Sequence, residues 1–485
     1  MYLHNLKLGF RHLFKNKALS IINIGGLAMG MTVAMLMALW IQDEISFDQF
    51  HDEGDHIYTV KRHVFSEDEI HTSDRVTFNI AGSLEQDYPE VSATAIVTYP
   101  RPLVITNETN SFRELGVYAT PSFFEIFSWE LLQGDPTQLL QKPDQILLSV
   151  SLAERYFGPN ALAQNQVIGQ QIEHQAEELP ALTVAGVFKD IPRQSSLQFD
   201  YVLPMQTYES NNQWMYNWNN SGIRIFAQLQ PGTDVEQLSE KIVNIQNDHI
   251  ESFRSDLFLQ AYPDQYLYSN FKDGKQAGGR ILYVRIFVIV AIFLILIACI
   301  NFMNLSTARA LQRVKEIGVR KAIGAERKSL IAQFMSESFI LMAIAFCFAI
   351  GLVLLCLPLF NNLASKEIAL QDFNNQTLIV FLGIGLLTTL VASTYPALYL
   401  SSFDAIKIIR GSFKQNVSST HLRRGLVVFQ FGMSILLIVG AITVQQQINY
   451  IQNKNLGLDR ENVLFLRMEG PIRQQYNRLK EELLT

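Results

Sequence analysis

The chain has 485 residues and a mass of 55.1 kDa, and 48% of its residues are hydrophobic, which argues against an ordinary soluble protein and indicates segments buried in lipid. Its 39 basic and 45 acidic residues leave a net charge of −6, which excludes a basic nucleic-acid-binding protein and a disordered acidic chain. Residues 42–280 carry 34 acidic and 15 basic side chains, a net of −19, and the rest carries 24 basic and 11 acidic ones, a net of +13.

Residues 1–17 combine apolar and basic side chains at helical spacing. Leu3, Leu6 and Phe10 fall on one helical face, and Lys7 falls on another. The pattern predicts an amphipathic cytoplasmic helix that lies in the inner membrane interface. A plain basic flank of the first membrane span is the alternative, and both interpretations stay open.

Five stretches are long and apolar enough to cross the hydrocarbon core of a bilayer as helices, which takes about 20 residues each. They are residues 18–41, 285–305, 339–360, 377–400 and 425–444. The first is too long for the apolar region of a signal peptide, and small residues typical of a cleavage site do not follow it. We therefore expect it to remain as a membrane anchor.

The distribution of lysine and arginine predicts a single topology for these five stretches. Basic residues precede the first stretch, and the loops at 306–338 and 401–424 are also basic, whereas the loop at 361–376 has one lysine. We expect the amino terminus and both basic loops on the cytoplasmic side of the membrane, in a multi-pass protein. Residues 42–280 and 445–485 then lie on the outer side.

The outer segment at residues 42–280 is predicted to be an α+β domain. Four β-rich runs occur, at residues 57–60, 145–149, 182–188 and 222–227. Residues 151–157 predict a short helix that stops at Gly158 and Pro159. All three cysteines lie outside this domain, so a hydrophobic core rather than disulfides must hold it together.

Catalytic and metal-binding patterns are weak in this domain. His51, His56, His63 and His71 lie among carboxylates, but their spacing does not place them on one helical face, so we predict no metal site. The sequence has neither a Gly-x-Ser-x-Gly nor a His-Glu-x-x-His motif, and we predict no catalytic residues. The aromatic residues at 214–218 would suit a partner or a sugar, although packing of a loop is the favoured interpretation.

The segment after the last apolar stretch, residues 445–485, contains an alternating run that starts at Val463 and ends at Leu466. Alternation of this kind predicts a strand. We expect residues 445–485 to begin a second extracytoplasmic domain, and hence the chain to be a fragment or a truncated product of a longer protein.

The cytoplasmic loop at 306–338 contains the basic segment 313–325, Arg-Val-Lys-Glu-Ile-Gly-Val-Arg-Lys-Ala-Ile-Gly-Ala. It predicts two short helices broken at Gly318 or Gly324. A short helix that packs on the ends of membrane spans moves with them, so this loop is the best candidate for contact with a cytoplasmic partner. A solvated basic loop with no partner is the alternative that composition alone favours.

Several motifs together resemble the MacB/FtsX-like permeases of ABC systems. In the membrane part they are residues 313–325, 333–338 (Gln-Phe-Met-Ser-Glu-Ser) and 395–401 (Tyr-Pro-Ala-Leu-Tyr-Leu-Ser). In the outer part, residues 151–158 and 184–192 are similar to the periplasmic core domain of that family. The resemblance covers essentially the whole chain and implies a membrane α-helical protein with a large α+β extracytoplasmic domain of the MacB periplasmic core type.

The resemblance also implies a partner and a contact site. Members of the family are driven by a cytoplasmic ATPase that meets the loop between the second and third helices. Carried onto this chain, that role falls on Lys315, Glu316, Gly318, Arg320, Lys321 and Gly324. The sequence has no Gly-x-x-x-x-Gly-Lys-Ser/Thr motif, so we expect no cofactor in this chain and ATP bound by a partner ATPase. The fifth helix is similar to the two-unit subgroup of the family.

The predicted function is that of an export permease, which transmits ATP-driven motion to extracytoplasmic domains for a lipoprotein, peptide, toxin or drug. The expected partners are the ATPase, the lipid bilayer, a second permease unit in a dimer or pseudo-dimer, and a periplasmic adaptor, without nucleic acid. One alternative is a non-transporting FtsX-like regulator of cell-wall hydrolases. Another is a membrane-anchored extracytoplasmic sensor or enzyme, which the missing catalytic pattern disfavours.

Overall fold

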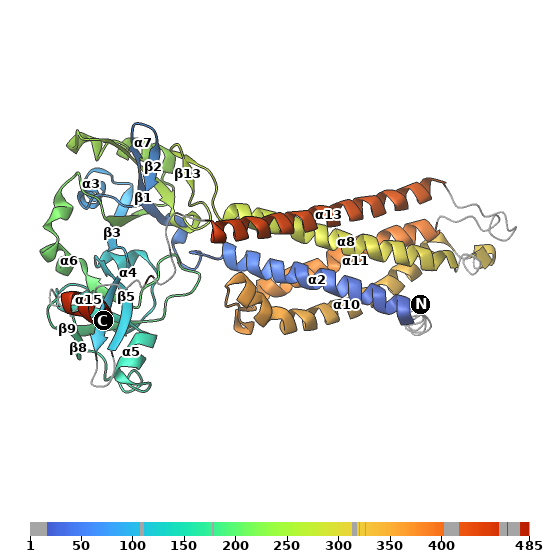
Figure 1. Ribbon diagram of the computed structural model, residues 1–485, viewed down its shortest axis with the longest axis horizontal. Coiled ribbons are helices and arrows are strands. Elements are labelled where there is room, and N and C mark those ends of the chain that lie inside the picture. The colour runs from blue at the N-terminus through green and yellow to red at the C-terminus, as the bar shows by residue number, and fades with distance from the viewer. Residues whose placement is uncertain are drawn as a thin grey trace. The chain divides into compact units, whose positions relative to one another are not determined.

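The computed structural model describes residues 17–106, 111–176, 179–312, 318–319, 321–324, 326–401, 417–454, 463 and 476–484. The chain divides into two compact units (Figure 1). We call the unit formed by Met1–Asp43 and Val284–Val463 the helical unit. The unit formed by Glu44–Tyr283 and Leu464–Thr485 is called the sheet domain.

Five long helices make up most of the described part of the helical unit. They are α2 (Lys17–Ile45), α8 (Ile281–Gln312), α10 (Arg327–Ala364), α11 (Asn375–Ser401) and α13 (Val417–Asn453). Each contains a stretch that is long and apolar enough to cross a membrane, judged by length and composition. The five apolar stretches predicted from the sequence all fall within these helices, and α13 continues past its stretch to Asn453.

Four of these helices, α2, α8, α10 and α11, share one buried apolar core. Small residues bring their backbones together: a Cβ atom built on Gly30 of α2 would lie 2.6 Å from the Cβ of Ala298 in α8. Gly26 and Gly30 have the Gly-x-x-x-Gly spacing that lets membrane helices pack closely. In the same way, a Cβ on Gly385 of α11 would lie 2.7 Å from the ring of Phe346 in α10.

Helix α13 differs from the other four because its apolar stretch, Arg424–Asn453, is 0% buried, whereas 44% of the stretch in α2 is buried. Phe431 and Ile435, for example, are 62% and 59% exposed. Packing within the described part of the chain therefore does not cover α13, and its apolar surface is available to lipid.

Twelve strands of the sheet domain form one sheet, and two more form a hairpin, in the described part of the chain. The strands of the first half are β1 (Ile57–Phe65), β2 (Ile70–Ser73), β3 (Val91–Thr98), β4 (Arg101–Thr106), β5 (Ser111–Ala119), β6 (Leu131–Gly134) and β7 (Gln145–Ser149). Those of the second half are β8 (Gln171–His174), β9 (Leu182–Phe188), β10 (Tyr201–Pro204), β11 (Ile223–Leu229), β12 (Arg254–Ala261), β13 (Phe271–Lys272) and β14 (Lys275–Gln276).

The order of strands in the sheet is β10-β7-β9-β8-β4-β5-β3-β11-β1-β12, with β2 beside β1 and β6 beside β9. Strand β10 also pairs in parallel with β5, which joins the six strands from β10 to β5 into a closed ring. The hairpin consists of β13 and β14. Strand β1 is central to the other half of the sheet because it pairs with β2, β11 and β12.

Short helices pack on this sheet. They are α3 (Asn79–Asp87), α4 (Ser122–Ile126), α5 (Val150–Phe157), α6 (Met205–Asn211) and α7 (Val235–Ile242). A further short helix, α15 (Tyr476–Leu484), follows near the end of the chain. Helices α3 and α7 share a core with β1, β3, β11 and β12. Helix α5 shares a second core with strands of the ring. The mixture of separate helices and a largely antiparallel sheet is the predicted α+β class.

The secondary structure expected in this domain is confirmed where the local signals were strong. The four predicted runs are found in β1, β7, β9 and β11, and the predicted helix is α5. Ser149 caps α5 by accepting a hydrogen bond from the Leu152 N–H at 3.2 Å. Gly158 follows the helix at φ +98°, where glycine is favoured.

Two sequence predictions fall on parts of the chain that the structure does not describe. The amphipathic helix predicted at residues 1–17 lies outside the described residues except for Lys17. Of the strand predicted to start at Val463, residues 464–466 also lie outside them.

Candidate functional site

The loop between α8 and α10 carries the six residues predicted to contact an ATPase. Three of them lie outside the described residues: Lys315, Glu316 and Arg320. The other three are described: Gly318, Lys321 and Gly324. Gly318 is buried and helical, so of the two predicted break points, Gly318 and Gly324, the first is not used.

The break comes at Gly324 instead. The Ile323 N–H donates to the Val319 carbonyl at 3.1 Å, and the Gly324 N–H donates to the Lys321 carbonyl at 3.0 Å. Gly324 has φ +102°, a conformation that favours glycine, and a Cβ there would meet no atom within 4 Å. Helix α10 begins directly afterwards, with Glu326 at its N-cap. The chain therefore makes a helical turn, stops at Gly324 and starts a new helix.

This turn exposes two apolar side chains, Val319 at 51% and Ile323 at 82%. Residues four apart lie on the same face of a helical turn, so the two side chains form one apolar surface. We call Val319 and Ile323 the loop contact pair. Sequence reasoning missed it because it followed the basic residues and the glycines. Two β-branched residues four apart in a basic loop would have been the signal.

At the C-terminal end of α2, polar side chains link this helix to the loop between α10 and α11. Gln42 donates to Oδ1 of Asn374 at 3.3 Å and accepts from the Thr377 hydroxyl at 3.0 Å. Lys366 forms an ion pair with Asp43, and each of the two side chains is only 14% exposed. This polar network lies within the helical unit and fixes where α2 ends against the loop.

The next residue, Glu44, belongs to the sheet domain and is 1% exposed. Arg280, the last residue before α8, forms an ion pair with it at 3.5 Å and places its guanidinium 4.7 Å from the ring centre of Tyr266. Phe47 stacks on the same ring at 3.7 Å. The points where the chain enters and leaves the sheet domain are thus tied together. We call Asp43, Glu44, Arg280 and Lys366 the junction ion pairs.

The aromatic residues at 214–218 pack mainly within their own loop. Met215 is buried, Trp218 stacks on His249 at 4.0 Å, and the Trp214 indole donates to Asn212 at 3.0 Å. Trp214 and Tyr216 remain 42% and 41% exposed. Loop packing, the favoured interpretation, therefore accounts for most of these contacts.

The histidines of the sheet domain lie in separate environments. His51 is buried among aromatic rings, with Trp129 at 4.7 Å, and burial lowers its pKa to about 4. His63 stacks on Phe258 at 4.3 Å, and His71 lies 3.5 Å from the Glu69 carboxylate. Among the described residues, no three His, Cys, Asp or Glu side chains are grouped in a way that could hold a metal ion.

Two domain families match this chain. The MacB-like periplasmic core domain matches residues 20–245, and the FtsX-like permease C-terminal domain matches residues 288–405. The first match covers most of the sheet domain and the second covers α8, α10 and α11. Both correspond to the motifs on which the family resemblance was based.

Individual relatives agree with these matches. A protein named Macrolide export ATP-binding/permease protein MacB from Bdellovibrio bacteriovorus is 26% identical over 38% of this chain and 27% of its own length. Its namesake from Haemophilus ducreyi is 34% identical over 19% of this chain and 13% of its own length. The Bacillus subtilis protein named Uncharacterized ABC transporter permease YknZ is 24% identical over 26% of this chain and 30% of its own length.

The chain therefore spans about a third or less of each of these relatives, and what the names say of them concerns those proteins. The two domain matches succeed each other along the chain in the order of its two units. They account for the large α+β domain and for α8, α10 and α11, whereas α13 lies beyond the second match. The chain thus belongs to the MacB/FtsX-like family of ABC transporter permeases, membrane proteins with several apolar helices and a large extracytoplasmic α+β domain.

Proposed function

We propose that this chain is the permease of an ABC export system and transmits ATP-driven movement from a cytoplasmic ATPase to its extracytoplasmic sheet domain. The observation that carries the proposal is the loop contact pair, because Val319 and Ile323 are exposed at 51% and 82% on the turn between α8 and α10. Apolar side chains exposed together in a basic loop suit burial against a partner. Gly318, Lys321 and Gly324 shape or flank this surface, and Lys315, Glu316 and Arg320 adjoin it in sequence.

The proposed orientation follows from the positive-inside rule. The basic loops at 306–338 and 401–424 face the cytoplasm, as does the amino terminus, in the inner membrane of a bacterium. Five helices cross the membrane, and the sheet domain lies outside. Residues 445–485 then emerge on the outer side.

A continuous helix supports the transmission of movement. Helix α8 has 32 residues and is about 48 Å long at 1.5 Å per residue, which exceeds the ~30 Å of the hydrocarbon core. It begins immediately after Arg280, which holds Glu44, and it ends at Gln312, at the start of the loop. A displacement of the loop that moves α8 as a rigid body would therefore reach the junction ion pairs.

ATP would be bound and hydrolysed by the ATPase, since the sequence has no P-loop motif. Closure of two ATPase subunits requires two permease units, so we propose a dimer or a pseudo-dimer. A periplasmic adaptor is a further proposed partner. The cargo class that we propose is a lipoprotein, peptide, toxin or drug that is taken up at the outer face.

The match of residues 288–405 to FtsX-like permeases also favours a second function. In this alternative the same movement regulates a cell-wall hydrolase and no cargo is transported. In both functions the loop must bind the ATPase, but the sheet domain contacts a different partner in each. A change in hydrolase activity without accumulation of cargo would identify the second function.

The experiment is to coexpress the full chain with an ABC ATPase subunit from the same organism, and to measure copurification and ATP turnover in detergent. We expect the wild-type chain to bind the ATPase and to change its turnover, and Ile323→Asp to lose both. The matched control is Leu363→Asp, because Leu363 is 79% exposed at the other end of α10. Equal binding by Ile323→Asp and the wild type would contradict the loop assignment, and failure of the wild type to bind would contradict the proposed function.

A further inference from the structure

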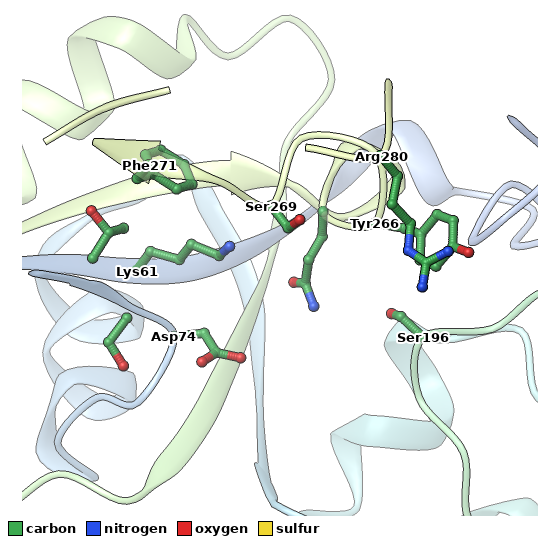
Figure 2. A pocket seen from close by; sticks show the side chains of 10 residues that line it. Lys61, Asp74, Ser196, Tyr266, Ser269, Phe271 and Arg280 are labelled. Carbon is green, nitrogen blue, oxygen red and sulfur yellow. The ribbon is translucent and has the colours of Figure 1, made fainter. Parts of the chain in front are cut away.

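A cavity of about 380 Å³ lies in the sheet domain, at one side of β1. Its lining includes Lys61 of β1, Asp74 directly after β2, and Gln265, Ser269, Phe271 and Arg280 from the segment 265–280. Figure 2 shows that the Lys61 side chain extends into the space between Asp74 and Ser269. This volume falls within the range of about 300–1,000 Å³ that is typical of small-molecule sites.

Lys61 is the most informative residue of this cavity. It is only 7% exposed, yet within the described part of the chain its ammonium group makes no hydrogen bond and no ion pair. Its Nζ lies 5.4 Å from the centre of the Phe271 ring. The stem of Lys61 is buried and its ammonium group faces the cavity, so an anionic group of a ligand there would replace water and gain a direct ion pair.

The charges around Lys61 do not supply that anion. The negative charge of Asp74 favours the charged form of Lys61 without an ion pair between the two. One Asp74 oxygen instead accepts a hydrogen bond from the Tyr99 hydroxyl at 2.5 Å. The negative charge of the same carboxylate also favours the charged form of Arg224, which is 6% exposed. Two buried cations therefore share one carboxylate. The Arg280 charge at the other side of the cavity is already paired with Glu44.

The rest of the lining suits an organic ligand rather than a bare ion. Thr59, two residues before Lys61 on β1, donates to Oε1 of Gln265 at 2.6 Å and thereby orients the amide of Gln265 at the cavity. The Ser269 hydroxyl also makes no hydrogen bond within the described chain. The rings of Tyr266 and Phe271 provide apolar contact. A ligand with one anionic group, hydrogen-bonding groups and a small apolar part would satisfy this lining.

We propose that this cavity is a binding site for a small organic carboxylate, whose carboxylate group binds Lys61 and whose polar groups bind Gln265 and Ser269. A single negative charge completes the balance of two buried cations and one carboxylate. A dianion such as phosphate would bring a second charge close to Asp74 and is disfavoured. The carboxylate can belong to a free small acid or to the end of a short peptide, and the two share the same chemistry. The site goes beyond the proposed coupling function and does not depend on an ATPase.

The test is isothermal titration of the full-length chain in detergent, without ATPase. The probes are N-acetylalanine and trialanine, each compared with its carboxamide. We expect at least one acid to bind about tenfold or more tightly than its amide, a difference of ~1.4 kcal/mol. Binding of N-acetylalanine alone would identify a free acid as the source, and binding of trialanine alone a peptide end. Equal binding of acid and amide, or no binding by either acid, would overturn the proposal.

Two substitutions with opposite expected effects locate the site. Lys61→Met keeps the length of the side chain, removes its charge and should abolish the preference for the acid. Asp74→Asn keeps an acceptor for Tyr99 and removes the competing charge, so it should tighten binding of the acid severalfold. The control is Lys189→Met, since Lys189 is 65% exposed and pairs with Glu130 elsewhere in the domain. Unchanged binding in both Lys61→Met and Asp74→Asn would place the acid elsewhere and overturn the proposal.

Discussion

The loop between α8 and α10 and the junction at the end of α2 are built in opposite ways. In the described part of the loop, Val319 and Ile323 expose apolar side chains to solvent. At the junction, Asp43 and Lys366 are paired and each is only 14% exposed. An exposed apolar surface gains stability when another molecule covers it, whereas the Asp43–Lys366 ion pair is already made within the chain.

The comparison assigns different tasks to the two places. The loop is suited to contact a partner that is absent from the chain, and the ion pairs at the junction are suited to hold the end of α2 within the helical unit and the start of α8 within the sheet domain. Damage to the loop should therefore affect binding more than stability, and damage to the junction should affect stability more than binding. Each prediction below compares these two measurements.

The largest effect is expected for the double substitution of Val319→Asp with Ile323→Asp. Burial of a Val or Ile side chain contributes about 1.5–3 kcal/mol, and a buried carboxylate adds a penalty, so ATPase affinity should fall by more than about a hundredfold. Thermal unfolding of the chain in detergent should not change, because both side chains are exposed already. A fall in unfolding temperature with intact binding would reverse the comparison.

A comparable loss of stability is expected in the sheet domain when the pH is lowered, because of His51. Burial lowers the pKa of His51 to about 4, against about 6.5 in an unfolded chain, so the unfolded state binds a proton first as the pH falls. The resulting loss grows between pH 6.5 and 4 and reaches about 3 kcal/mol. Asp52 opposes the shift in pKa.

Denaturant unfolding of the full chain, followed by tryptophan fluorescence, measures this loss because Trp129 lies 4.7 Å from the His51 ring. His51→Phe should reduce the acid sensitivity in this range, whereas substitution of the exposed His71 by Phe should leave it unchanged. Identical pH profiles for His51→Phe and the wild type would show that His51 does not cause the loss.

A smaller effect is expected for Lys366→Met at the junction. The substitution leaves the largely buried Asp43 without its ion pair to Lys366 and should cost about 2 kcal/mol of unfolding free energy. ATPase affinity should stay within about twofold. The control Lys189→Met removes a pair that is 65% and 58% exposed, and should cost less than about 1 kcal/mol. Equal costs for the two variants would mean that burial does not strengthen the junction.

The smallest effect is expected for Gly324→Ala in the loop. No atom lies within 4 Å of the new Cβ, so the cost of about 1 kcal/mol comes only from φ +102°. If the ATPase binds only the conformation that the turn has in the wild type, its affinity should fall about fivefold. Gly432→Ala is the control, since its Cβ also meets nothing within 4 Å but it lies inside α13, where alanine is the better helix former. Equal results for both glycines would argue against a role for the turn.

Much of the fold could be predicted from the sequence because its signals are local. The apolar stretches depend only on length and composition, and the cap at Ser149 and the stop at Gly158 act within one helix. The close contact of Gly30 with Ala298 was missed, although Gly-x-x-x-Gly spacing is visible in the sequence, because no local signal names the partner helix.

The candidate sites were harder to predict because they combine distant residues. Glu44 and Arg280 are separated by the whole sheet domain in sequence and meet only because the chain returns to its entry point. Lys61 gave no signal on its own, since a lysine on a strand is ordinarily solvated and only the fold buries it. The spacing of Val319 and Ile323 was visible as a signal in the sequence, but their exposure is known only from the fold.

The central claim is that movement of the loop reaches the sheet domain through α8. The most direct measurement is hydrogen–deuterium exchange of residues 264–283 in the complex of full chain and ATPase, with and without ATP. The account predicts that ATP changes exchange in this segment and that Ile323→Asp abolishes the change. If the ATPase is bound and hydrolyses ATP while exchange at residues 264–283 stays the same, the claim is contradicted.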